Sequence, residues 1–88
     1  MNDTISEMKR RLAVLAPEHI EVADESALHA GHAGARSGAG HYQLTLIATA
    51  FTGQNNVARH RAIYQALGDL MATHIHALSI TALAPGEL

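Results

Sequence analysis

Apolar residues follow two different spacings along this chain, and the order of those spacings constrains the fold more than any other feature. In residues 4–16 and 56–72 they recur three or four positions apart, which is the pattern of an amphipathic helix. In residues 19–24, 41–49 and 75–83 they recur at every second position, which is the pattern of a strand. The predicted order is helix, strand, strand, helix, strand.

The first predicted helix has a recognisable inner face and recognisable ends. Its apolar stripe consists of Ile5, Met8, Leu12 and Leu15. Thr4 and Glu7 have the spacing of a capping box, and Pro17 ends the helix. The basic residues 9–11 lie mostly off the stripe, so we expect them to face solvent.

The second predicted helix mixes apolar and basic side chains. Its expected inner stripe consists of Val57, His60, Tyr64, Leu67 and Met71, with Ile63 and Leu70 beside it. Asn55 or Asn56 is expected to cap the helix at its start. Gly68 lies inside the helix at a cost of up to ~1 kcal/mol relative to Ala, and we expect it to allow close packing on a strand.

Residues 25–40, between the first two predicted strands, are rich in Gly, Ala and Ser and show no periodic apolar pattern. Loops longer than ~12–15 residues in a compact domain tend to be functional or disordered. We therefore expect a mobile loop, which carries His29 and His32.

The order of elements predicts one domain, residues 1–88, with an α+β fold of two layers. The first two strands form an antiparallel pair through the long loop. The second helix crosses over to the third strand, and a right-handed crossover of this kind makes that strand parallel to its predecessor. Both helices then cover one face of a three-stranded mixed sheet.

Composition limits what such a domain can bind. Lys and Arg number 6 against 8 Asp and Glu, so the net charge of −2 argues against strong electrostatic binding to nucleic acid. The core is small, which excludes a large self-contained cofactor cavity, and the absence of Cys excludes thiolate ligands and nucleophiles. No apolar run approaches the ~20 residues of a membrane span, and no signal segment begins the chain, so we expect a cytoplasmic protein with no membrane partner.

Histidine and arginine are the residues that could carry chemistry. His76 begins the last strand and is expected on the side of Leu78 and Ile80, at an end of the sheet. His29 and His32, three positions apart, could chelate weakly from the loop. No catalytic triad or acid–base pair is suggested by spacing, so the chain is not expected to be an enzyme.

Three consecutive residues, Arg59, His60 and Arg61, lie in the first turns of the second helix. Cations are mildly disfavoured there by the helix dipole, so they indicate an anionic partner. Arg59 and Arg61 point about 200° apart on a regular helix and are both expected to be exposed. His60 lies on the apolar stripe one turn from Tyr64, where a structural, hydrogen-bonded role is expected.

Five stretches, in this order along the chain, match the motifs of one family: Val22–Ser26 followed by His29, His41–Tyr42, Phe51–Gly53, Arg59–Tyr64 and Ile75–Leu78. Arg59–Tyr64 looks like that family's RHRxIY signature, of which His60 and Tyr64 are part, and Ile75–Leu78 looks like its late histidine motif. On these residues the sequence resembles the BolA-like family across almost its whole length. The resemblance implies a KH-like (class II) fold that lacks the GxxG loop, and the C-terminal helix of many relatives is expected to be truncated or absent.

The resemblance also implies a function. BolA-like proteins pair with monothiol glutaredoxins in iron–sulfur cluster assembly, trafficking and iron signalling. In their complexes a [2Fe–2S] cluster bridges the two proteins, and glutathione and the glutaredoxin supply the thiolates. Carried over, the imidazole ligands are His76 and His29, with His32 as a substitute and His41 and His74 as lesser candidates. We expect Arg59 and Arg61 to contact the partner or glutathione. The isolated chain is expected to hold no cofactor.

Two alternatives stay open. Some family members are regarded as DNA-binding transcriptional regulators linked to stress, which would use the Arg59/Arg61 helix and the KH-like surface. Several phosphate contacts would give a steep dependence of affinity on salt, which six basic residues in an acidic chain make difficult. A third reading is that the histidines bind haem or a free metal ion.

Overall fold

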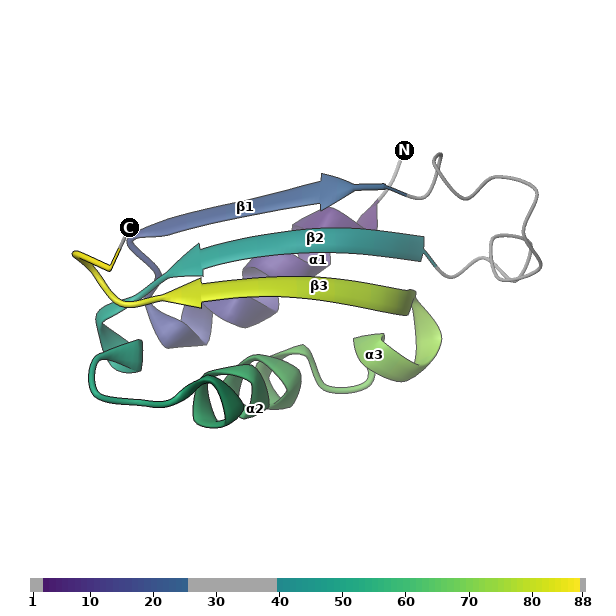
Figure 1. Ribbon diagram of the computed structural model, residues 1–88. Helices are drawn as coiled ribbons and strands as arrows, with labels where there is room; N and C mark the ends of the chain where they lie inside the picture. Colours follow the sequence, from purple (N-terminus) through teal and green to yellow (C-terminus); the bar gives the residue numbers. More distant parts are fainter. Residues whose placement is uncertain (1–2, 26–39, 88) are drawn as a thin grey trace.

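Three strands form one mixed sheet in the order β1-β2-β3, as Figure 1 shows. The structure, a computed structural model, describes residues 3–25 and 40–87, so the expected mobile loop with His29 and His32 lies outside the described residues. The strands are β1 (His19–Asp24), β2 (Gly40–Ile47) and β3 (Ile75–Leu83). β1 pairs antiparallel with β2, and β2 pairs parallel with β3. The predicted mixed sheet is confirmed.

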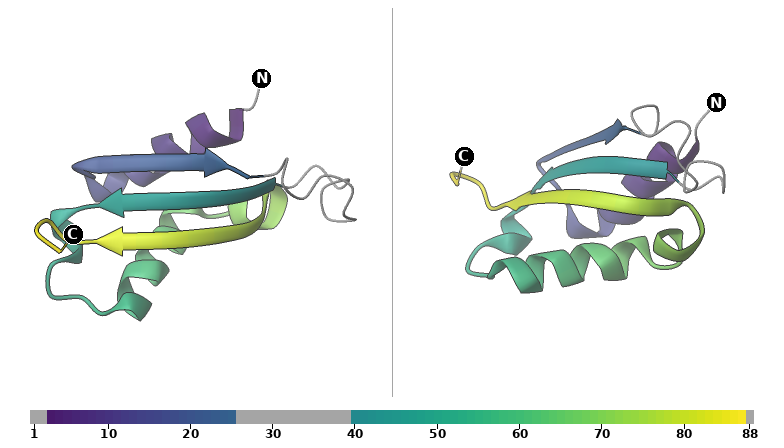
Figure 2. Two further views of the ribbon diagram at one scale, coloured as in Figure 1. Left: turned by 45° about the horizontal axis from the view of Figure 1, so that its top comes forward. Right: turned by 45° about the vertical axis from the view of Figure 1, so that its right-hand side comes forward.

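The helices lie on one face of this sheet (Figure 2), which confirms the two-layer α+β arrangement. α1 (Asp3–Leu12) continues into the short 3₁₀ helix Ala13–Leu15. The crossover from β2 to β3 contains a 3₁₀ turn (Thr49–Phe51), α2 (Asn56–Leu67) and α3 (Leu70–Thr73). No helix in the described ranges is long and apolar enough to cross a membrane.

One glycine divides the predicted helix 56–72 into α2 and α3. Gly68 has a φ of +57°, and its backbone N–H donates to the Tyr64 carbonyl at 2.9 Å. A positive φ at the end of a helix favours Gly because a Cβ would meet the backbone. A Cβ added at Gly68 would meet Arg11 of α1 and the Gln65 carbonyl of α2 and no described strand residue within 4 Å, so our expectation that Gly68 allows close packing on a strand is wrong.

The core lies between the helices and the inner face of the sheet. Leu44 and Leu46 of β2 are fully buried beside Met8 and Leu12, which confirms the predicted stripe of α1. The rest of the buried cluster includes Phe51, Ile63, Leu67 and Leu70. This cluster holds the chain in one hydrophobic unit.

The inner stripe predicted for residues 56–72 is wrong at Val57 and Tyr64, whereas Leu67 is buried and Met71 packs against the core as predicted. Val57 and Tyr64 retain 64% and 42% of their accessible surface, whereas Arg59 and Ile63 are buried. Both stripes have helical spacing, and a stripe that contains an Arg is seldom the buried one because charged groups rarely become buried. The choice between them depends on what pairs with Arg59.

Arg11 joins α1 to the end of α2, although we expected the basic residues 9–11 to face solvent. Its Nη1 donates to the Leu67 carbonyl at 2.8 Å and to Asp69 Oδ1 at 2.6 Å. Its Nε donates to Glu7 Oε2 at 2.8 Å, and Arg10 Nε donates to Glu7 Oε1 at 2.9 Å. Glu7 therefore pairs with two arginines of its own helix, and the predicted capping box with Thr4 stays a prediction.

Candidate functional site

Both boundaries of the undescribed segment 26–39 lie at the end of the sheet where β3 begins (Figure 1). The Glu25 N–H donates to the His41 carbonyl at 2.8 Å, and the Gly40 N–H donates to the His74 carbonyl at 3.0 Å. These bonds connect the end of β1 to β2, and the start of β2 to the chain just before β3. Three of the histidines that the sequence analysis singled out, His41, His74 and His76, lie at this end of the sheet.

His76 lies at an interruption of the β2–β3 ladder. Gly40 pairs with Ile75 and His41 pairs with Ala77, so His76 has no opposite residue on β2. An extra residue of this kind redirects its side chain relative to the normal strand alternation. His76 is exposed, whereas Leu78 and Ile80 pack against the core. The predicted position at a sheet end is confirmed, but the expected shared environment with Leu78 and Ile80 is wrong.

His41 lies next to His76 on the neighbouring strand. The two ring centroids are 5.0 Å apart, and the ring planes are inclined by 52°. His41 is half-buried, and it is next to the buried Tyr42 in β2. The sequence analysis left His41 as a lesser candidate, and strand spacing alone does not say which residues of two strands meet.

His74 has a different environment. Its side chain is exposed, and its Nδ1 lies 2.7 Å from the Thr73 hydroxyl oxygen. Within the described ranges, no group of three or more His, Asp or Glu side chains could hold a metal ion. The predicted ligands His29 and His32 lie outside those ranges, so their pairing with His76 stays a prediction.

Arg59 is buried, which contradicts the prediction of an exposed residue that contacts a partner. Its Nη1 and Nη2 donate to the two carboxylate oxygens of Glu87 at 2.6 and 2.9 Å. Its Nε donates to the Gln54 carbonyl at 2.8 Å, and its Nη1 also donates to the Ala82 carbonyl at 3.0 Å. The guanidinium carbon lies 5.9 Å from the centre of the Phe51 ring. Arg59 therefore joins α2 to the end of β3 and the C-terminal turn.

Glu87 makes this burial tolerable because a buried cation needs a paired anion and satisfied donors. Hydrogen bonds from Arg59 and from the Ala84 N–H lower the pKa of Glu87 to about 2. The hydrogen bonds that Arg59 donates to Glu87 also raise the pKa of Arg59. No spacing rule links two residues this far apart in sequence, so sequence reasoning could not find the pair.

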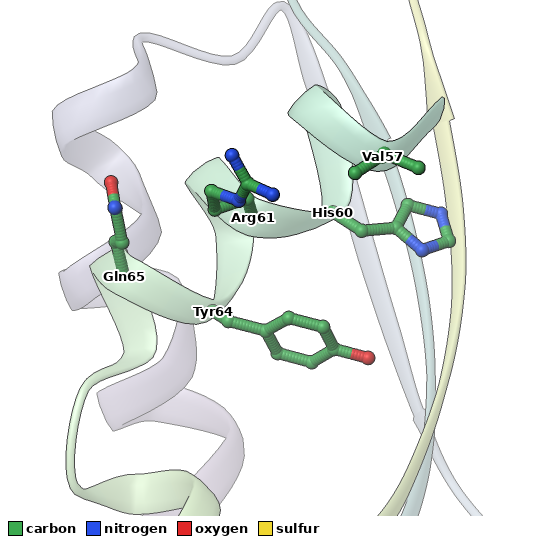
Figure 3. Close-up of a pocket in the computed structure, with 5 residues that line it drawn as sticks. All are labelled: Val57, His60, Arg61, Tyr64 and Gln65. Carbon is green, nitrogen blue, oxygen red and sulfur yellow. The ribbon is translucent and has the colours of Figure 1, made fainter. Parts of the chain in front are cut away.

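Arg61 is exposed, as predicted, and lines an open groove of about 490 Å³ on α2 together with Val57, His60, Tyr64 and Gln65. Val57, His60 and Tyr64 extend from one side of the helix, and Arg61 and Gln65 project in another direction (Figure 3). Arg59 and Arg61 thus have different environments, in agreement with their predicted angular separation. Among the described residues Arg61 has no carboxylate partner.

His60 is half-buried and forms part of the wall of this groove. No hydrogen bond to its ring is found within residues 3–25 and 40–87, so the expected hydrogen-bonded structural role has no support there. The signature residues of this segment therefore separate into two groups. Arg59 serves the fold, while His60, Arg61 and Tyr64 line a surface.

Comparisons with known proteins agree on one family. The family model described as "BolA-like protein" matches residues 12–87. The chain is 44% identical over 79 residues to "SufE-like protein 1, chloroplastic/mitochondrial" of Arabidopsis thaliana, a match that covers 84% of this chain and 21% of the plant protein. It is 42% identical over 64 residues to "DNA-binding transcriptional regulator BolA" of Vibrio cholerae, covering 73% of this chain and 58% of that protein.

Solved structures show the same fold. The "BolA domain of SufE1 from Arabidopsis thaliana" superposes with a TM-score of 0.85 at 37% identity, and covers 100% of this chain and 99% of that one. "BolA1 from Arabidopsis thaliana" superposes with a TM-score of 0.84 at 34% identity, with 100% and 98% covered. The chain spans only about a fifth of the plant SufE-like protein and just over half of the Vibrio protein.

Proposed function

This chain belongs to the BolA-like protein family, and we propose that it is a non-enzymatic, cytoplasmic adaptor that pairs with a monothiol glutaredoxin and co-ligates a bridging [2Fe–2S] cluster. Its role would be in iron–sulfur cluster assembly, trafficking or iron signalling. The observation that carries the proposal is His76, an exposed imidazole at a break in the β2–β3 ladder.

The available donor atoms fit a shared cluster. A [2Fe–2S] cluster takes four ligands, and two imidazoles can replace two thiolates on one iron, which raises the reduction potential. The chain has seven His and no Cys, so any thiolates must come from outside it. A glutaredoxin cysteine and glutathione supply them in this proposal.

His76 is the ligand for which the structure offers a physical reason. Strand residues on both sides of it pair with β2, so its backbone is already ordered before a ligand binds. Ordering one free residue costs roughly 1–2 kcal/mol, a cost that His76 avoids. His29 is the proposed second ligand, with His32 as its substitute. His29 lies four positions after Glu25, the last described residue after β1, and a chain of this length reaches at most ~14 Å.

Arg61 and the groove beside it are the proposed contact surface for the glutaredoxin or for glutathione. Arg61 is an exposed cation without a carboxylate partner in the described part of the chain, and glutathione carries carboxylates. Exposed Val57 and Tyr64 add apolar area to the same groove. Arg59 is left out of this surface because Glu87 already occupies its guanidinium.

The test is a reconstitution of the chain with a monothiol glutaredoxin, glutathione and iron, followed by visible absorption and circular dichroism. We expect the wild-type complex to give the spectrum of a cluster with both His and thiolate ligands. The His76→Ala complex should lack this spectrum and show at most the glutaredoxin's own cluster. His74→Ala is the matched control, since His74 is exposed and lies two residues from His76. A wild-type spectrum from the His76→Ala complex would refute the proposed ligand.

A nucleic-acid-binding regulator is the second candidate, because the Vibrio relative carries the name "DNA-binding transcriptional regulator BolA". Arg10, Arg11 and Arg59 are each paired with a carboxylate, which leaves Lys9 and Arg61 as the unpaired cations of the described residues. Each phosphate contact contributes about −0.9 to the slope of log affinity against log salt concentration on duplex DNA. A slope steeper than about −4 in a DNA titration would favour this second function.

A further inference from the structure

The His41 and His76 rings have a separation that suits one metal ion between them. A metal–nitrogen bond measures about 2.0–2.1 Å, and the nitrogen lies about 1.2 Å from the ring centre. Two imidazoles on a tetrahedral ion therefore have ring centres about 5 Å apart. The observed separation is 5.0 Å.

From this geometry we infer that His41 and His76 together form a binding site for a single divalent transition-metal ion in the uncomplexed chain. The two-imidazole donor set suits borderline ions such as Zn²⁺, Co²⁺, Ni²⁺ and Cu²⁺ and does not suit Ca²⁺ or Mg²⁺. This metal site is separate from the proposed cluster. His76 is the one residue that the two sites share, and His41 belongs to the metal site alone.

Both ligands are held by the sheet. His41 pairs with Ala77 on β3, and Ile75 on the other side of His76 pairs with Gly40 on β2. The extra residue in this part of β3 brings His76 beside His41, whereas regular pairing would place Ala77 alone opposite it. The two rings therefore meet before an ion binds, and little ordering is required.

The surroundings allow the remaining coordination positions to be filled. His76 is exposed, so water can complete the coordination. An imidazole has two ring nitrogens, and a ligating His commonly uses the second one in a hydrogen bond that fixes its orientation. No third His, Asp or Glu of the described residues joins the pair, so we expect an open two-ligand site of modest affinity.

Use of His76 by both sites has a functional consequence. An ion held by His41 and His76 occupies the imidazole that the proposed cluster requires. Metal binding to the free chain and cluster binding in the complex therefore exclude each other. His41 belongs only to the mononuclear site, so changes at His41 separate the two.

The experiment is a titration of the intact chain, without glutaredoxin, with Zn²⁺ alone. The imidazole ¹⁵N and ¹H resonances are followed by NMR, and the affinity is measured by competition with a chromophoric chelator. We expect the His41 and His76 resonances to shift together with one binding constant. His41→Ala and His76→Ala should each weaken Zn²⁺ binding by about tenfold or more, and the double variant should be no weaker than either one.

His74→Ala and His60→Ala are the controls, and both should leave the affinity within about twofold. Amide spectra show whether His41→Ala retains the fold, and the wild-type resonance shifts test the site without any variant. If His76 shifts without His41, or if His41→Ala binds Zn²⁺ as the wild type does, the inference is wrong. Because no glutaredoxin is present, that result leaves the proposed cluster function standing, and a failed reconstitution leaves this site standing.

Discussion

The guanidinium of Arg59 and the carboxylate of Glu87 meet in a two-pronged ion pair, with N–O distances of 2.6 and 2.9 Å. This pair explains why Arg59 is 7% exposed although it belongs to a basic run that suggests a binding surface. It also ties the C-terminal turn to α2, because the same carboxylate accepts the Ala84 N–H at 2.8 Å. The two arginines of the run consequently have opposite roles.

Substitution at the two arginines should separate those roles. Arg59→Ala removes the partner of Glu87 and the donors to the Gln54 and Ala82 carbonyls, so the melting temperature should fall by roughly 5 °C or more. Arg61→Ala should change the free energy of unfolding by less than about 0.5 kcal/mol. Thermal denaturation of both variants measures the difference, and equal stability of the two would contradict the assignment.

Charge reversal at Arg61 should weaken the complex with the glutaredoxin. Arg61→Glu places an anion where the groove is proposed to receive a carboxylate, so affinity should drop by about tenfold or more. Lys9→Glu is the control, because Lys9 lies on α1 and outside this groove. Isothermal titration calorimetry measures the affinity of both variants for the glutaredoxin. A similar loss of affinity in both would show that net charge, and not the position of Arg61, causes the effect.

The Arg59–Glu87 pair should make stability depend on acid pH. The pKa of Glu87 is lowered from 4.5 to about 2 in the folded chain, so its contribution is fully present above pH 4.5 and is lost as the pH falls towards 2. Denaturant midpoints measured from pH 6 to pH 2 follow this loss. Glu87→Gln should flatten the profile relative to the wild type, though not completely, because the pKa of Glu7 is also lowered to about 2 by Arg10 and Arg11.

Gly68 should tolerate no side chain without cost. Its φ of +57° and ψ of −130° lie in a region that Gly adopts and that strains residues with a Cβ, so Gly68→Ala should lower the free energy of unfolding by about 1–3 kcal/mol. An added Cβ would also lie 3.4 Å from Arg11 Nη1, which bonds Leu67 and Asp69. Gly53→Ala is the matched control, with a φ of +80° and no heavy atom within 4 Å of the added Cβ. Unchanged stability of the Gly68→Ala variant would contradict the prediction.

Local sequence patterns predicted the strands and α1 well. The bounds of β1 and β3 agree with the predicted 19–24 and 75–83, and Asn55 caps α2 by accepting the Ala58 N–H at 2.9 Å. These features depend on residues that are close in sequence, where spacing and capping rules apply directly. The family motifs were also visible, and the comparisons bear out the family.

The sequence by itself thus determined the order of elements, the mixed sheet and the inner stripe of α1, because each depends on local periodicity and on the handedness of one crossover. Only the tertiary structure decided which face of α2 is buried, how Arg59 is used and which histidine lies beside His76. Those outcomes depend on Glu87 meeting Arg59 and on a one-residue register shift between β2 and β3. Both join residues far apart in sequence, and the free energy of pairing a buried charge overrides the helical pattern that would have placed Tyr64 inside.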